Sequence, residues 1–385
     1  MLELQVMEAA MARNICIFSD GTGQAGGANP INWTHVYRLF KATREIDPPR
    51  QICFYDPGLG SSPDAGETRG LFRRVKDALA QATGYGITDN IVDCYTALLL
   101  SYRPGDTVYL FGFSRGAYTV RSLGGALGLC GIPPGLPKLE RWDEFEAQIH
   151  GDVRDIAKEA VTKVYQERDA GMRAAAAAAF RTKYGSQELP PHFIGVWDTV
   201  KALGIKGISD LLPGRHSFNN DLLNPKVAHG RQALSIDENR KTFKPEIWDE
   251  RGAPPRQIEQ RWFSGVHTDI GGGYGLAMGL SDITLTWMLD AATMIDPPLL
   301  VDPLLVAELR PDHRGIQHDE LQSGVLPWMP GTRENFVTNA YFGSPGKPSV
   351  EVDPRFREPK VPILDEERPY RPVAMRQHPD FQHYY

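Results

Sequence analysis

The chain has 385 residues, 41% of them hydrophobic, so it can bury a substantial core as one large domain with insertions or as two ordinary domains. Its net charge is −6, and acidic and basic side chains are mixed along the sequence. This distribution argues against nucleic acid as a partner. The four cysteines lie far apart without zinc-ligand spacing, which favours buried thiols in a reducing compartment over a disulfide framework.

The N-terminal residues show no signal-peptide pattern, and no stretch reaches the roughly 18 apolar residues that a membrane span needs. We therefore expect no transmembrane segment and synthesis in the cytoplasm. If the protein is exported, we expect a route that does not depend on a signal peptide.

The first half of the chain alternates short apolar runs with helical periodicities, beginning at residue 13. This pattern is typical of a mostly parallel sheet with helices on both faces. In chain order, the sequence predicts a strand at 14–19, a helix within 32–46, a strand at 51–56, a helix at 86–102 and a strand at 107–113.

The segment 133–190 departs from this alternation, because it is first proline-rich and then charged and alanine-rich. We expect one or two amphipathic helices inserted into the domain, and we consider them a candidate lid.

Strands that run into polar or glycine-rich loops return at 192–200 and 257–275. A last long helix is expected to start near Ser281 as its N-cap. From about residue 297 the chain becomes irregular and proline-rich, and we expect an extension that wraps the core.

A Gly-x-Ser-x-Gly motif with Ser114 at its centre stands between the strand predicted at 107–113 and a segment that predicts a helix. In α/β hydrolases this motif forms the nucleophile elbow, a tight turn that exposes the serine hydroxyl at the top of the sheet. The motif alone has little specificity in a chain with 38 glycines. Its position between strand and helix favours Ser114 as a nucleophile over a structural turn serine.

A nucleophilic serine needs a base, and the base needs a carboxylate that orients it. The chain order in α/β hydrolases is Ser, Asp or Glu, then His. Asp198 is the first acid at the end of a convincing downstream strand, and His267 is the first histidine so placed. The alternatives are a turn or N-cap role for Asp198 and a loop role for His267, with His313 or His318 as the base.

Acyl transfer also requires N–H groups that face the developing oxyanion. In α/β hydrolases one belongs to the residue after the nucleophile, here Arg115, and one to the loop after the third strand. If the strand before Ser114 is the fifth of that fold, this loop contains Gly21 and Thr22. The chain would then lack the first two edge strands.

Acidic residues at the strand ends leave a second interpretation open. Asp20 is expected to be either a structural acceptor for loop N–H groups, which we favour, or a metal ligand. Together with Asp198, His267 and Asp269 it would suit a divalent cation, and Asp56 also lies at a strand end.

Five segments in this order resemble a widespread bacterial and fungal α/β-hydrolase family that includes the first class of type VI secretion lipase effectors. They are FSDGTG, FGFSRGAYTVRSLGG, IGVWDTV, HGRQALSIDENRKTFKPEIWD and RWFSGVHTDIGGGY, and the resemblance covers most of residues 13–295. It implies a serine hydrolase, with phospholipase activity in the effector members. It also implies a catalytic triad of Ser114, Asp198 and His267.

We therefore expect an α/β-hydrolase-like catalytic domain at 13–300, followed by an irregular C-terminal extension at 301–385. The expected activity is that of a serine esterase or lipase, phospholipase-like, which acts on an ester or phospholipid without a cofactor. An exported enzyme would need a secretion or immunity partner. The alternatives are a metal-dependent hydrolase with Ser114 as an auxiliary residue, and a non-catalytic binding protein on a hydrolase fold.

Overall fold

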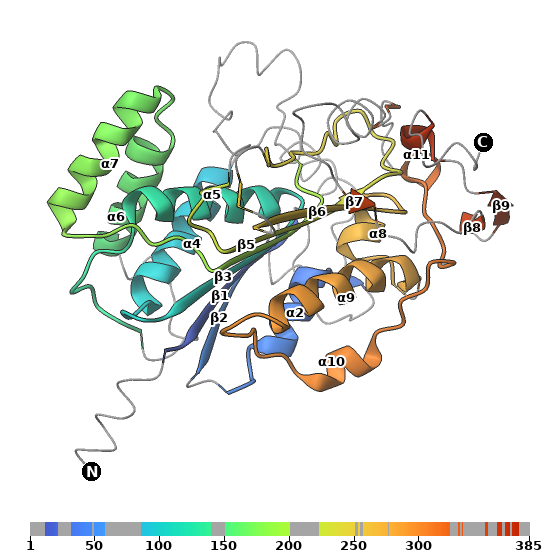
Figure 1. Ribbon diagram of the computed structural model, residues 1–385, viewed down its shortest axis with the longest axis horizontal. Coiled ribbons are helices and arrows are strands. Elements are labelled where there is room, and N and C mark those ends of the chain that lie inside the picture. Colours follow the sequence, from blue (N-terminus) through green and yellow to red (C-terminus); the bar gives the residue numbers. More distant parts are fainter. Residues whose placement is uncertain are drawn as a thin grey trace, which may run out of the picture.

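A parallel sheet with helices on both faces forms the centre of the protein in a computed structural model (Figure 1). The structure describes residues 12–21, 32–47, 50–57, 86–139, 151–200, 223–250, 253–254, 257–275, 277–323, 330–331, 333, 351–352, 360–363, 366–369 and 372–376.

The main sheet has seven parallel strands in the order β2-β1-β3-β4-β5-β6-β7. A separate antiparallel pair is formed by β8 and β9. The strands are β1 (Asn14–Ser19), β2 (Gln51–Asp56), β3 (Thr107–Phe113), β4 (Phe193–Trp197), β5 (His229–Ser235), β6 (Ile258–Phe263), β7 (Glu351–Val352), β8 (Lys360–Ile363) and β9 (Glu366–Pro369).

Two hydrophobic clusters lie on opposite faces of this sheet because successive strand residues point to opposite sides. In β1, Ile15 and Ile17 belong to one cluster, and Cys16 and Phe18 belong to the other. Helices α4 (Ile87–Ser101), α5 (Arg115–Cys130), α6 (Gly151–Glu159), the π-helix η3 (Ala160–Tyr165) and α7 (Ala170–Tyr184) lie on the first face (Figure 1). Helices α2 (His35–Thr43), α8 (His267–Gly271), α9 (Gly279–Thr293) and α10 (Pro303–Glu308) lie on the second. The short elements α11 (Glu320–Ser323) and η5 (Val373–Met375) follow later in the chain.

The predicted fold class and the strands predicted before Ser114 are confirmed, with β1, β2 and β3 at the expected residues. The N-cap prediction for Ser281 is wrong. Helix α9 begins two residues earlier, and the Ser281 hydroxyl donates to the carbonyl of Met278 at 3.1 Å. Strand β5 was not predicted, because its sequence HGRQALS is too polar to stand out as a buried strand.

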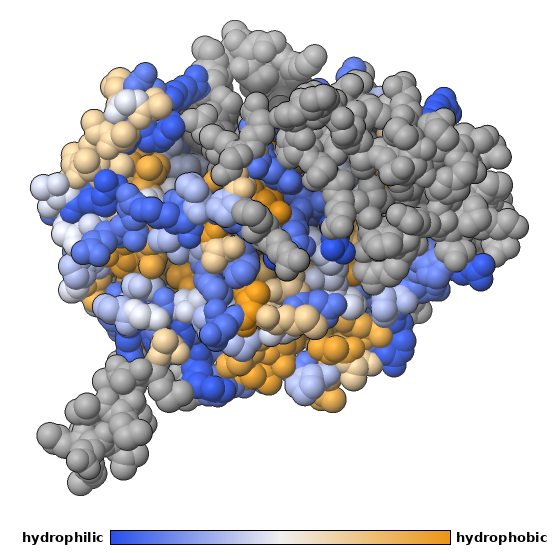
Figure 2. All heavy atoms as spheres, viewed as in Figure 1, coloured by the Kyte–Doolittle hydropathy of each residue, from blue (hydrophilic) through white to orange (hydrophobic). Residues whose placement is uncertain are grey.

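The described helices of the insertion cover α4 and the second half of α5. Arg181 of α7 donates to the carbonyl of Leu129, and the Tyr165 ring of η3 lies over Gly125. These α5 residues are more than ten positions from Ser114, about 15 Å along a helix. Much of the α7 surface is alanine and charged residues (Figure 2), and Met172 is the large hydrophobic residue that these described helices expose to solvent. The described insertion helices therefore pack along the helical layer, and their role as a lid stays a prediction.

All four cysteines are free and buried, as the composition predicted. Among the residues that the structure describes, no helix is long and apolar enough to cross a membrane.

The N-terminal end of α5 packs directly against the end of β1, and this contact requires glycine. A Cβ atom on Gly116 would lie 2.1 Å from the carbonyl oxygen of Ser19 and 2.5 Å from that of Asp20. A Cβ atom on Gly112 would lie 2.5 Å from the carbonyl oxygen of Gly116. Gly116 is thus needed for the contact between the end of β1 and α5, and Gly112 for the contact between β3 and the first turn of α5.

We predict that Gly116→Ala lowers the free energy of unfolding by about 1–3 kcal/mol or more, since the added methyl group meets backbone atoms that cannot rotate away. Gly151→Ala at the start of α6 is the matched control, because nothing lies within 4 Å of its Cβ position. Chemical denaturation measures both. Equal stability of the two variants would contradict the close packing of β1 and α5.

Candidate active site

Ser114 lies in a tight turn between the end of β3 and the first residue of α5. Its backbone has φ 57° and ψ −118°, a conformation that residues other than glycine rarely adopt, so the surrounding structure must hold it. The Ser114 N–H donates to the carbonyl of Trp197 at 3.0 Å, and the Ser114 carbonyl accepts from the N–H of Val200 at 3.5 Å. These bonds fasten Ser114 to residues on either side of Asp198.

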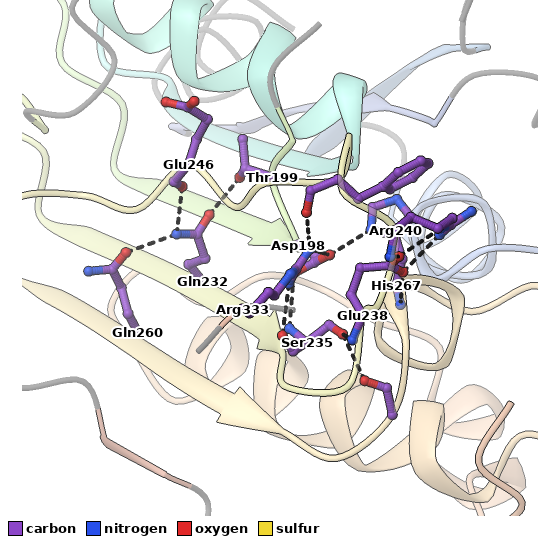
Figure 3. Close-up of polar contacts among 12 residues, drawn as sticks. Asp198, Thr199, Gln232, Ser235, Glu238, Arg240, Glu246, Gln260, His267 and Arg333 are labelled. Carbon is purple, nitrogen blue, oxygen red and sulfur yellow. Dashed lines mark hydrogen bonds and ion pairs between the residues drawn. The ribbon is translucent and has the colours of Figure 1, made fainter. Parts of the chain in front are cut away.

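Asp198 directly follows β4, and its side chain is completely buried. Its Oδ1 accepts from the N–H of Ser235 at 2.9 Å and from Nη1 of Arg333 at 2.6 Å (Figure 3). Its Oδ2 accepts from Nη2 of Arg333 at 2.9 Å and pairs with Nδ1 of His267 at 2.6 Å. Burial raises the pKa of Asp198, but the Arg333 charge and the hydrogen bonds from His267 and Arg333 outweigh it and hold that pKa well below its usual range. Asp198 is therefore ionised at neutral pH.

His267 is the first residue of α8, in the turn that follows β6. An ionised carboxylate can only accept hydrogen bonds, so the neutral imidazole carries its proton on Nδ1, which faces Asp198, and its lone pair on Nε2. The ring centroid lies 4.6 Å from that of Phe113, the residue before Ser114. Within the described part of the chain, no hydrogen bond joins the Ser114 hydroxyl to His267.

A second buried carboxylate, Glu238, holds the backbone of α8. Its Oε2 accepts from the N–H of His267 at 3.1 Å, and its two oxygens accept from the Arg240 guanidinium at 2.7 and 2.8 Å. Burial raises the pKa of Glu238, but the hydrogen bond and charge of Arg240 lower it overall. The Arg240 guanidinium also lies 3.6 Å from the ring centroid of Phe243, whose ring meets that of His267 edge-on at 5.0 Å. The position of His267 is thus fixed through both its backbone and its ring.

Arg115 is the first residue of α5, so its N–H lies at the N-terminal end of that helix, where the helix dipole favours negative charge. Its side chain is buried, and burial lowers the pKa of its guanidinium to about 10. The predicted first oxyanion donor is therefore placed directly after the Ser114 turn.

Asp20 follows β1 and accepts three hydrogen bonds. Its Oδ1 accepts from the N–H of Gly21 at 2.7 Å, and its Oδ2 accepts from the hydroxyls of Thr34 at 2.7 Å and Tyr55 at 2.8 Å. These contacts correspond to the structural acceptor role favoured from the sequence. The Gly21 N–H faces Asp20 in this structure, and Thr22 lies outside the described residues, so their role as oxyanion donors stays a prediction.

Asp269 pairs with another histidine. Its Oδ1 lies 2.7 Å from Nδ1 of His318, and its Oδ2 accepts from the N–H groups of Val266 and His318 at 3.0 and 3.1 Å. The His318 ring stacks on Tyr274 with centroids 3.7 Å apart. Of the histidines considered as the base, His267 therefore contacts Asp198, whereas His318 contacts Asp269.

The four residues of the metal interpretation belong to separate clusters. Asp198 and His267 bond to each other, Asp269 bonds to His318, and Asp20 faces two hydroxyl groups. Across the residues described by the structure, no group of three or more His, Cys, Asp or Glu side chains could hold a metal ion.

Several residues of this site were not predicted to belong to it, among them Ser235, Glu238 and Arg333. Ser235 and Glu238 lie in the segment 229–249, whose resemblance to the hydrolase family was noted without assigning a role to its residues. Arg333 had no sequence signal, because the sequence around it shows neither helical nor strand periodicity and it lies 135 positions from Asp198.

The family model described as the catalytic domain of Tle1-like phospholipase effectors of the type VI secretion system matches residues 13–291. This match spans most of the chain, so the chain belongs to that family. The resemblance found in the sequence is thereby confirmed.

Other comparisons give more distant similarities. An uncharacterized protein of Saccharomyces cerevisiae, YEL023C, is 28% identical over 245 residues, which cover 61% of this chain and 33% of the yeast protein. An uncharacterized protein from Pseudomonas aeruginosa, solved by crystallography, is 18% identical with a TM-score of 0.44, covering 81% of this chain and 51% of that one. The Tle1 effector bound to the VgrG spike of the type VI secretion system is 16% identical with a TM-score of 0.37, covering 69% of this chain and 52% of that one. The chain thus spans about a third of the yeast relative and about half of each solved chain.

The strand-end carboxyls Asp20 and Asp56 predict a pH-dependent stability. Burial raises the pKa of each to about 7, although hydrogen bonds from neighbouring hydroxyl and amide groups oppose it. Each carboxyl binds more protons in the folded than in the unfolded state, so its contribution to stability is present below about pH 4 and is lost as the pH rises to 7.

We therefore expect Asp20→Asn and Asp56→Asn each to flatten the fall in the free energy of unfolding between about pH 4 and pH 7. Urea denaturation over this pH range measures the effect. The exposed Asp155→Asn in α6 should leave the curve unchanged. If both buried variants retained the wild-type curve, the raised pKa values would be contradicted.

Proposed function

We propose that this chain is a serine hydrolase that cleaves carboxylic esters through an acyl-enzyme on Ser114. The observation that carries the proposal is the buried 2.6 Å contact between Asp198 and Nδ1 of His267, next to the strained turn that holds Ser114. The order of the three residues along the chain matches that of the α/β-hydrolase triad, and they follow β3, β4 and β6 of the parallel sheet. In this proposal the Ser114 turn is the nucleophile elbow.

The contact of Nδ1 with Asp198 supports the role of His267 as the base. Because Asp198 holds the proton on Nδ1, the lone pair on Nε2 is available to take the proton of the Ser114 hydroxyl. The hydrogen bond between nucleophile and base is often long in ligand-free enzymes and tightens only when substrate binds.

The proposed reaction has two steps, acylation and deacylation, and each passes through a tetrahedral intermediate. Ser114 Oγ attacks the ester carbonyl carbon, and its proton passes to Nε2 of His267, which then protonates the departing alcohol. A water molecule next attacks the acyl-enzyme, again giving its proton to His267, and the carboxylic acid leaves as Ser114 regains its hydrogen. Asp198 stays ionised and stabilises the imidazolium in both steps.

The oxyanion would be held by the Arg115 N–H and by a donor of the loop after β1. Close packing of Gly116 on Ser19 and Asp20 brings this loop to the start of α5. The Gly21 N–H must leave Asp20 to serve as the second donor, or Thr22 must supply it.

Phospholipids are the proposed substrate class because the family is one of phospholipase effectors. By the same argument, we propose that the protein is delivered by type VI secretion and that a spike protein of the VgrG kind carries it, as in the solved Tle1 complex. An immunity partner would then protect the producing cell.

Turnover of a soluble nitrophenyl ester and of phospholipid vesicles tests the activity. Ser114→Ala and His267→Ala should each reduce kcat by more than about 10⁴-fold, because each substitution removes a catalytic side chain whose function no other side chain can take over. His313→Ala is the matched control and should retain nearly full activity. Residual activity of Ser114→Ala close to that of the wild type would contradict the proposed nucleophile.

Asp198→Asn tests the orienting carboxylate separately. An amide in place of the carboxylate favours the wrong tautomer of His267, so we expect kcat per folded molecule to fall by about 10⁴-fold. Initial rates together with circular dichroism measure kcat and the folded fraction. A folded variant with full activity would show that Asp198 does not orient the base.

A further inference from the structure

Arg333 lies beyond the residues that match the family model, yet its side chain reaches the centre of the proposed active site. Only 2% of the residue is exposed. Its Nη1 donates to Asp198 and to the carbonyl of Ser235 at 2.6 and 2.8 Å, and its Nη2 donates to Asp198 and to the carbonyl of Phe243 at 2.9 and 2.8 Å (Figure 3). The four N–H groups of the two Nη atoms are therefore all used.

This bonding pattern fixes the Asp198 carboxylate in one plane. A planar guanidinium matches a carboxylate bidentately, and the two carbonyl contacts fix the guanidinium itself. The Oδ2 atom that Arg333 holds is also the atom that contacts Nδ1 of His267. Arg333 thus determines the direction in which Asp198 presents its oxygen to the imidazole.

The backbone before Arg333 is anchored on the segment that contains Arg240. The N–H of Gly331 donates to the carbonyl of Asn239 at 2.8 Å, and Pro330 forms an antiparallel bridge with Arg240. A Cβ atom on Gly331 would lie 2.8 Å from Cα of Lys241, so glycine permits this close approach. The position of Arg333 is therefore set by packing of the extension on the loop after β5.

Further contacts from the extension reach α8. His318 bonds to Asp269 within α8, and Glu320 lies 3.4 Å from the guanidinium of Arg240. Arg240 in turn binds Glu238, the acceptor for the N–H of His267. The extension hence supports both members of the Asp198–His267 pair.

We propose that Arg333 is a positioning residue of the active site, and that the C-terminal extension through this residue completes the catalytic unit. This inference rests on the proposed ester hydrolysis. Arg333 acts through Asp198: it orients the carboxylate and places a fixed positive charge opposite the imidazolium that forms during catalysis.

The fixed charge gives Arg333 a signature in the pH–rate profile. Among the described residues, Asp198 from the end of β4 contacts the His267 ring, and Glu238 from the loop after β5, with its partner Arg240, contacts the His267 backbone. Arg333 from the extension contacts Asp198, and Asp269, paired with His318, lies two residues further along α8. The positive charge of Arg333 disfavours a second positive charge on the imidazole, and this effect is lost when Arg333 is replaced by a neutral residue. Because this charge opposes the gain of a proton by the site, the acidic limb of the profile would move to higher pH without it.

The experiment compares Arg333→Gln, Arg333→Lys and the control Arg314→Gln in the full chain, with a soluble ester as substrate. Arg314 is an exposed arginine of the same extension. We expect Arg333→Gln to lower kcat by about 10- to 100-fold with little change in KM, and to shift the acidic limb to higher pH. Arg333→Lys, which keeps the charge but loses the planar fork, should lower kcat without that shift.

Added methylguanidinium, which can occupy the space left in an Arg333→Ala variant, should restore part of kcat.

A folded Arg333→Gln with the wild-type kcat and pH profile would overturn the inference and leave the proposed function intact. The inference would equally fail if all Arg333 variants lost activity only in proportion to their unfolded fraction, without a pH shift or rescue. A wild-type chain that hydrolyses no ester would overturn the proposed function, and this inference with it.

Discussion

The buried carboxylate of Asp198 is the constraint on which the rest of the site depends. An unpaired charge in the interior costs several kcal/mol, so its oxygens must be matched by donors. The structure supplies these donors from β5, α8 and the C-terminal extension, through Ser235, His267 and Arg333. Three distant parts of the chain must therefore meet at one point before the site exists.

The parallel sheet makes this convergence geometrically simple. The carboxyl ends of β1, β3, β4, β5 and β6 all lie at the same edge, and Asp20, Ser114, Asp198 and Ser264 directly follow four of these strands. A buried polar chain supports the same edge: Gln232 of β5 bonds to Thr199 and to Gln260 of β6 (Figure 3). The strand ends thus carry the candidate reactive residues, and buried hydrogen bonds within β5 and β6 connect the strands behind them.

Much of the fold and the centre of the site could be predicted from the sequence. Apolar runs revealed β1 to β4, and the search for an ordered acid and histidine identified Asp198 and His267, whose side chains are in contact in the structure. Strand β5 was missed because it buries polar residues such as Gln232, whose hydrogen bonds only the folded structure supplies. Arg333 was missed for a related reason, since no periodicity connects a single arginine in an irregular segment to an aspartate 135 positions away.

The most direct test of the central claim is labelling of the folded wild-type chain with a fluorophosphonate probe, followed by peptide mass spectrometry. A serine reacts with such a probe only when its hydroxyl is activated, so the account predicts a covalent adduct on Ser114 that is lost in Ser114→Ala and His267→Ala. A folded wild-type chain that remains unlabelled, or one that is labelled at a different serine, would contradict the account.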